Sequence, residues 1–172
     1  MESREDFFRR LLQTYSGALQ RLASCYEENA TLREDLLQEI YLALWQAIPR
    51  FRGDASERTW LYRIAHNTAI SSSLSRGRRS KREHPMPERF DPPSAAEPAD
   101  RRILAEEERR SLFASIRRLP VEDRQIVTLH LDGLSYAEIE NVTELSQTAI
   151  ATRLSRLRKK LAESIGALEK RK

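Results

Sequence analysis

Prolines crowd one stretch of this chain and divide it into two parts. Five of the seven prolines lie between residues 84 and 100. Proline lacks the backbone N–H that a helix or an inner strand requires, so this stretch is predicted to be extended. The segments on either side carry apolar residues at helical spacing, without the period-two alternation of strands. We therefore expect an all-α protein with two small helical domains, at residues 5–83 and 103–170, joined by a Pro-rich extended linker at residues 84–102.

The composition favours two small cores over one large core. Of the 172 residues, 33% are charged and only five are glycine. Basic residues outnumber acidic residues by 14 to 11 in residues 1–83 and by 11 to 8 in residues 111–172, whereas acidic residues lead by 7 to 5 in residues 84–110. Two basic ends around an acidic middle are typical of two contact surfaces for a polyanion, although a solvated surface explains the composition equally well.

Several classes of protein are disfavoured by what the chain lacks. Cys25 is the only cysteine, so no disulfide or cysteine-based zinc site can form within one chain, and we expect a half-buried structural thiol in a reducing, cytoplasmic compartment. The N-terminal sequence MESREDFFRRLL is unlike a signal peptide. No stretch approaches the roughly 18 apolar residues of a membrane span, so no membrane insertion is expected.

The chemistry-bearing residues argue against an enzyme. We find no nucleophile–base arrangement and no Gly-rich phosphate loop, so neither catalysis nor a cofactor is expected. His66 has no second ligand at a suitable spacing, which disfavours a metal site. A small nuclease that uses Asp35, Glu39 and Asp54 is one alternative, but these acids lack supporting ligands.

The first domain is predicted to hold three helices. Apolar residues recur at helical spacing over residues 7–26 and indicate the first helix. Thr31 and Glu34 have the spacing of a capping box, which predicts the start of the second helix. That helix is expected to end before Pro49, and Ser56 is the expected N-cap of the third helix.

The second domain contains the pattern of a helix–turn–helix. Gly133 is placed to end one helix, and Ser135 with Glu138 has the spacing of a second capping box. A short helix is expected at residues 136–142, and Ser146 is the expected N-cap of the last helix. A short capped helix, a turn and a longer helix form the arrangement with which many proteins enter the major groove of DNA.

The last helix separates an apolar stripe from a polar face. The stripe consists of Ile150, Leu154, Leu157, Leu161 and Ile165. The residues expected to contact duplex DNA are Gln147, Thr148, Ala151, Thr152, Arg153, Ser155, Arg156 and Lys160. Gln147 and Arg156 are suited to base edges, whereas Arg153 and the lysine are suited to phosphates. The alternative is an amphipathic helix with a solvated basic face.

Two longer segments resemble a known family. RRLPVEDRQIVTLHLDGLSYAEI, followed by LSQTAIATRLSRLRKKL, closely resembles region 4 of bacterial sigma factors, and DLLQEIYLALWQAIPRFRGDASERTWLYRIAHNTA resembles their region 2. The two-module layout is similar to that of the extracytoplasmic-function (ECF) group. The turn at residues 140–144 departs from the family in having no glycine, so a positive φ there would cost roughly 1 kcal/mol. Ala151 and Ser155 stand where relatives often carry larger contact residues.

The resemblance implies a sigma factor that binds core RNA polymerase, directs it to promoters through their −35 and −10 elements, and promotes promoter melting. The clamp helices of the largest polymerase subunit would bind the first domain, at the helix face formed by Asp35, Gln38, Glu39 and Leu42. The flap of the second-largest subunit would bind the last domain. Promoter DNA would be bound both double- and single-stranded, and many relatives also bind an anti-sigma factor.

The resemblance further implies that FRGDASERTWLYRIAHN captures a base flipped out of the downstream element. Phe51 and Tyr62 are expected to wall the pocket, while Asp54 and Ser56 read the base edge. The residues expected to contact this element are Phe51, Arg52, Gly53, Asp54, Ala55, Ser56, Tyr62, Arg63 and Asn67. The role of Trp60 is left open between this site and core packing, with core packing favoured.

A polymerase-independent helix–turn–helix transcriptional regulator is the alternative function. It would leave residues 31–67 without an explanation. The linker resembles the family's connector, whose acids would mimic an RNA backbone inside the polymerase, but a plain tether explains the same composition.

Overall fold

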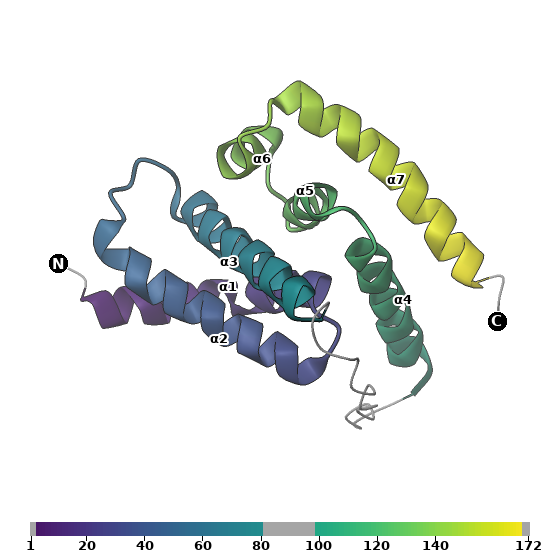
Figure 1. The fold of residues 1–172 in the computed structure, drawn as a ribbon, viewed down its shortest axis with the longest axis horizontal. Helices are drawn as coiled ribbons and strands as arrows, with labels where there is room; N and C mark the ends of the chain where they lie inside the picture. Colours follow the sequence, from purple (N-terminus) through teal and green to yellow (C-terminus); the bar gives the residue numbers. More distant parts are fainter. Residues whose placement is uncertain (1–2, 81–98, 170–172) are drawn as a thin grey trace.

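The computed structural model describes residues 3–80 and 99–169, and within these ranges every regular element is a helix. The helices are α1 Arg4–Tyr26, α2 Ala30–Ala47, α3 Glu57–Ser80, α4 Ala99–Arg117, α5 Val121–Leu131, α6 Tyr136–Thr143 and α7 Gln147–Glu169, with a 3₁₀ helix η1 at Ile48–Arg50 (Figure 1). The predicted all-α fold is confirmed. Residues 81–98, which contain the Pro-rich stretch of the predicted linker, lie outside the described residues, and residues 99–102 of that linker are helical.

The first module consists of α1 to α3, and its second helix begins earlier than predicted. The Asn29 side chain accepts a hydrogen bond from the Leu32 backbone N–H at 3.1 Å and caps α2. The capping box predicted at Thr31 and Glu34 is therefore wrong. Asparagine is among the strongest N-cap residues, and its position places Thr31 inside the first turn.

The join between α2 and α3 follows the sequence pattern. Pro49 lies in the 3₁₀ helix η1, directly after α2. Because proline lacks a backbone N–H, it cannot extend the α-helix α2. Gly53 has a φ of +79° in the loop that follows, a conformation that glycine adopts readily. The Thr59 backbone N–H donates to Ser56 Oγ at 3.1 Å, which confirms Ser56 as the N-cap of α3.

The second module consists of α4 to α7 and contains the predicted helix–turn–helix. Both halves of the Ser135–Glu138 capping box are present at the start of α6. Glu144 has a φ of +61°, so a non-glycine residue closes the turn in the left-handed region, as the missing glycine suggested. The Ala149 backbone N–H donates to Ser146 Oγ at 3.3 Å, which confirms Ser146 as the N-cap of α7.

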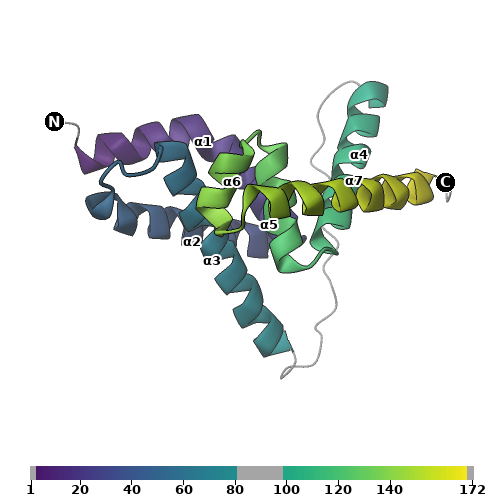
Figure 2. The same cartoon turned by 90° about the horizontal axis from the view of Figure 1, so that it is seen from above.

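The two modules pack against each other. α3 contacts α5 and α6, while α1 contacts α4 and α5 (Figures 1 and 2). The buried apolar residues form one continuous cluster rather than the two separate cores that the composition favoured. Cys25 is only 2% exposed, not half-buried, because its thiol faces Thr128 of α5 across this junction.

Candidate nucleic-acid interface

One face of α2 is exposed and combines acids, an amide and a leucine. This face carries the four predicted polymerase-binding residues, and all four are exposed: Asp35, Gln38, Glu39 and Leu42. Leu42 is 55% exposed and places an apolar side chain among these polar residues. The opposite face is buried through Leu36, Ile40 and Leu44. An acidic face with an apolar centre is complementary to a basic partner surface.

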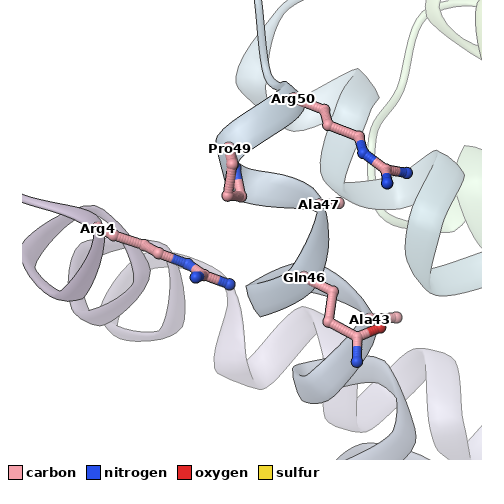
Figure 3. Close-up of a pocket in the computed structure, with 6 residues that line it drawn as sticks. All are labelled: Arg4, Ala43, Gln46, Ala47, Pro49 and Arg50. Carbon is pink, nitrogen blue, oxygen red and sulfur yellow. The ribbon is translucent and has the colours of Figure 1, made fainter.

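An open hollow of about 580 Å³ lies at the C-terminal end of α2. It is lined by Arg4, Ala43, Gln46, Ala47, Pro49 and Arg50 (Figure 3). The Arg4 side chain reaches across from α1, donates to the Trp45 carbonyl and lies 3.9 Å from the centroid of the Trp45 ring. Arg4 is thus already engaged within the protein, and we assign no ligand to the hollow.

Phe51 belongs to a cluster of aromatic rings at the start of the loop before α3. Its ring centroid lies 4.8 Å from that of Trp60 and 5.7 Å from that of Phe7. Tyr62 instead contacts the His66 ring, so the structure does not bring the two predicted pocket walls, Phe51 and Tyr62, into ring contact. The loop side of the predicted site is open to solvent at Arg52, Gly53, Asp54 and Ser56, with Ala55 half-buried.

Two of the three predicted DNA-contacting residues on α3 face the second module. Tyr62 is only 2% exposed, and its pKa is raised by burial and by the Asp132 carboxylate. The Arg63 guanidinium donates to the Asn141 backbone carbonyl. Asn67 remains exposed, beside an open hollow of about 440 Å³ between α2 and α3. In this arrangement the second module covers Tyr62 and engages Arg63.

His66 is a core residue. It is fully buried, its Nδ1 lies 3.0 Å from the Tyr26 hydroxyl, and burial lowers the pKa of His66 to about 3. In the described ranges no group of three or more His, Cys, Asp or Glu side chains is arranged to hold a metal ion. None of the helices described combines the length and apolar character of a membrane span.

The exposed face of α7 carries most of the residues predicted to contact duplex DNA. Gln147, Thr148, Thr152, Ser155, Arg156 and Lys160 are exposed, whereas Ala151 and Arg153 are half-buried. Gln147 Nε2 donates to Glu140 Oε2 at 2.8 Å, which ties the start of α7 to α6. Arg153 Nη1 lies 3.2 Å from Asp123 Oδ1, so this arginine is held by α5 of its own module.

Comparison with known proteins decides the family. Residues 11–79 match Sigma-70 region 2, and residues 109–161 match Sigma-70, region 4. The chain is 32% identical over 171 residues to the ECF RNA polymerase sigma-E factor of Escherichia coli (strain K12), which covers 95% of this chain and 89% of that protein. The chain belongs to the ECF family of RNA polymerase sigma factors. This sigma factor is also 30% identical to the RNA polymerase sigma-H factor of Pseudomonas aeruginosa, over 92% of its own chain and 86% of that protein.

Solved structures show the same fold. The sigma factor RpoE from Bartonella quintana, in complex with the anti-sigma factor NepR, superposes with a TM-score of 0.72, at 21% identity over 92% of this chain and 96% of that one. CnrH, in complex with the cytosolic domain of CnrY, superposes with a TM-score of 0.65, at 24% identity over 93% of this chain and 88% of that one.

Sequence reasoning missed the residues that join the two modules. The Arg58 guanidinium donates to the Asp132 carbonyl, and the Arg117 guanidinium donates to the Ser24 carbonyl at 2.8 Å. Every residue has a backbone carbonyl, so a contact between an arginine and a carbonyl has no side-chain pattern by which a sequence could predict it.

Proposed function

We propose that this sigma factor divides promoter recognition between its modules. The first module binds core RNA polymerase and the unpaired −10 element, and the second module reads the duplex −35 element. The observation that carries the proposal is the presence of regions 2 and 4 in one chain, with an exposed polar face on α2 and another on α7. The protein acts by binding and carries out no catalysis of its own, and it works in the cytoplasm with the polymerase.

For polymerase binding, we assign the α2 face formed by Asp35, Gln38, Glu39 and Leu42 to the clamp helices of the largest subunit. Acids around an exposed leucine support this assignment, because charges orient the partner while the apolar side chain is desolvated at the centre. The second module is assigned to the flap of the second-largest subunit, by resemblance to the family.

For the −35 element, we assign the exposed N-terminal half of α7. Small side chains at Thr148 and Ser155 permit a close approach to the major groove. Gln147 and Arg156 are placed to reach base edges, and Lys160 lies one turn further along for phosphate contact. Arg153 is assigned to positioning, because Asp123 holds it.

For the −10 element, we assign the loop at residues 51–56 and the face of α3 that carries Tyr62, Arg63 and Asn67. Exposed loop residues such as Asp54 can hydrogen-bond to the edge of an unpaired base. An anti-sigma factor is a further candidate partner, because the similar RpoE was solved in complex with one.

Run-off transcription with purified core polymerase on a genomic promoter library tests the proposal. We expect specific transcripts only when this sigma factor is added, and formation of a complex with core polymerase in the absence of DNA. Sequence-specific DNA binding without any association with core polymerase would instead support a polymerase-independent regulator.

A further inference from the structure

The loop at residues 51–56 is exposed at its tip and anchored at its two ends. Arg52, Gly53 and Asp54 are exposed, and Gly53 stands in the left-handed region with a φ of +79°. An exposed tip has few neighbours of its own that could fix its shape, so the elements that hold its ends have to do so. The structure gives three sets of contacts near those ends, and each involves the first two turns of α1.

At the start of the loop, the Phe51 ring packs into a group of three rings. Its centroid lies 4.8 Å from that of Trp60 and 5.7 Å from that of Phe7. The Phe7 and Trp60 centroids are themselves 6.4 Å apart and meet edge to face, an arrangement favoured between aromatic rings. Phe7 of α1 therefore helps to fix the position of the first loop residue.

At the end of the loop, Arg10 of α1 binds the first turn of α3. Arg10 Nη1 donates to Glu57 Oε1 at 3.1 Å and Nη2 donates to Glu57 Oε2 at 2.8 Å, so the pair is bidentate. Glu57 is the first residue of α3 and follows Ser56, the N-cap and last residue of the loop. The guanidinium carbon of Arg10 also lies 4.9 Å from the centroid of the Phe7 ring. The ion pair and the group of rings are thus joined through α1.

The helix that precedes the loop is also held from α1. Arg4 reaches from α1 to the end of α2 (Figure 3), where it donates to the Trp45 carbonyl and lies over the Trp45 ring. The Phe8 ring meets the Trp45 ring edge to face, with 5.3 Å between the centroids. Ser3 caps α1, and Leu11 is fully buried, so the turns that carry these side chains are fixed in the first module.

Base recognition depends on how accurately such a loop is held. A loosely held binding group loses conformational entropy each time it captures its ligand, and it discriminates poorly between similar ligands. Contacts that fix both ends of the loop before DNA arrives reduce that cost and keep the polar groups of Asp54 and Ser56 in one geometry. In this chain the contacts come from a helix that carries none of the residues assigned to DNA.

We propose that the first two turns of α1 brace the loop at residues 51–56 and thereby set how strictly it discriminates between bases of the −10 element. The brace consists of Arg4, Phe7, Phe8 and Arg10. Its members are positioning residues, which act through the residues that they hold at the two ends of the loop. The inference rests on the proposed function of that loop.

The ion pair between Arg10 and Glu57 allows the brace to be broken and repaired. Arg10→Glu and Glu57→Arg each place like charges side by side, whereas the double variant restores an ion pair in the reverse orientation. Arg9→Glu is the matched control, because Arg9 pairs with Asp6 of its own helix and the change in charge is the same as in Arg10→Glu. Both arginines are exposed, so the helical circular dichroism should not change.

Tryptophan fluorescence of the free protein tests the brace itself. Trp45 and Trp60 are the only tryptophans of the chain, and both are half-buried. In a Trp45→Phe background, Trp60 alone reports on the group of rings that holds Phe51. Acrylamide should quench it more strongly in the two single variants of the ion pair, and at the wild-type level in the double variant and the control. Unchanged quenching in both single variants, or an equal change in the control, would overturn the brace.

Base discrimination by the polymerase holoenzyme tests the consequence. Competition between pre-melted promoters that differ at one base of the −10 element measures the ratio between the best-bound and the worst-bound base. At equal polymerase occupancy this ratio should fall about three- to fivefold in each single variant, the range that loss of one partly exposed ion pair allows. It should return to the wild-type value in the double variant. Arg10→Glu and Glu57→Arg change the net charge in opposite directions, so a general electrostatic effect would move overall affinity in opposite directions.

A wild-type ratio in both single variants, or a ratio that stays low in the double variant, would overturn the inference. Phe7→Leu removes a ring of the brace but keeps apolar bulk, and it decides the question if the charge variants fail to fold. It should also lower the ratio, whereas Phe113→Leu, which removes a half-buried ring from the second module, should not. Equal ratios in these two variants would overturn the inference as well. The fluorescence experiment uses neither polymerase nor DNA, so a failure of the brace is distinguishable from a failure of the proposed function, which a wild-type holoenzyme without base preference would show.

Discussion

The Tyr26 hydroxyl lies 3.0 Å from Nδ1 of His66, and both side chains are buried. The contact joins the end of α1 to the middle of α3 in the interior of the first module. Burial lowers the pKa of His66 to about 3, so the imidazole is neutral in the folded protein at neutral pH. Because an unfolded chain restores a histidine pKa of about 6.5, this site makes stability depend on pH.

Acidification should weaken the fold through His66. Between pH 6.5 and pH 3 the unfolded chain binds a proton that the folded chain excludes, so the free energy of unfolding falls with falling pH. The expected loss attributable to His66 is about 2 kcal/mol on going from pH 7 to pH 5. Urea unfolding of wild type and His66→Gln at both pH values measures it. An unchanged pH dependence in His66→Gln would contradict this assignment.

Glu144→Gly should stabilise the second module. Glu144 has a φ of +61°, and relief of the left-handed strain, about 1–2 kcal/mol, exceeds the additional backbone entropy that glycine loses, about 0.5–1 kcal/mol. We expect the free energy of unfolding to rise by about 0.5–1 kcal/mol in urea titrations. Ala137→Gly, inside α6, is the matched control and should lower it by about 1 kcal/mol. A decrease in both variants would show that Glu144 is not strained.

Reversal of charge on α2 should weaken polymerase binding. Asp35→Lys with Glu39→Lys leaves the buried face of α2 intact, so circular dichroism should not change. Affinity for core polymerase, measured without DNA, should fall by at least tenfold, or about 1.4 kcal/mol. The control is Glu108→Lys with Glu163→Lys, which makes the same change in charge at exposed positions of the second module. Equal affinities in the two double variants would exclude the α2 face as the docking surface.

Arg156 and Lys160 should differ in what they contribute to −35 recognition. Loss of a bidentate base contact costs roughly 1–3 kcal/mol at one base pair, so Arg156→Ala should relax specificity at one position. Lys160→Ala should weaken binding evenly across sequences and reduce its salt dependence. Affinity measurements on a set of single-base promoter variants distinguish the two effects. The same sequence-independent loss in both variants would show that the roles are wrongly assigned.

Asp54→Ala tests base capture without disturbing the core, because Asp54 is exposed in the loop before α3. We expect reduced permanganate reactivity of unpaired promoter thymines at equal polymerase occupancy. A template already mismatched across the melted segment should restore part of the signal, since less unpairing energy is required. Gln13→Ala, at an exposed position on α1, is the control. Wild-type reactivity and sequence preference in Asp54→Ala would place the base-reading group elsewhere.

Helix positions and caps were largely predictable, because they depend on neighbours three or four residues away. Ser56, Ser135 and Ser146 cap the helices that the sequence assigned to them. The error at Thr31 arose where two good capping residues lie within one turn, and Asn29 took the role. The exposed faces of α2 and α7 were predictable for a similar reason, since helical periodicity separates a buried stripe from a polar face.

The side-chain contacts of the predicted base pocket could not be predicted from local sequence patterns. Phe51 and Tyr62 are close in sequence and both aromatic, yet Phe51 packs with Trp60 while Tyr62 faces Asp132. Proximity along the chain does not determine which neighbour a ring contacts when it lies on a loop or at the side of a helix. That choice depends on which other elements pack there.

The sequence by itself determined the helices, the division into two modules and the family, because periodicity, caps and prolines act locally and the family motifs are contiguous. Only the tertiary structure decided that the modules close on each other, burying Cys25 and Tyr62 and engaging Arg63. Arg21 and Asp132 are 111 positions apart, and other contacts between the two modules join arginines to backbone carbonyls. Such contacts depend on how two helical bodies meet in space, and no local pattern of residue types encodes that.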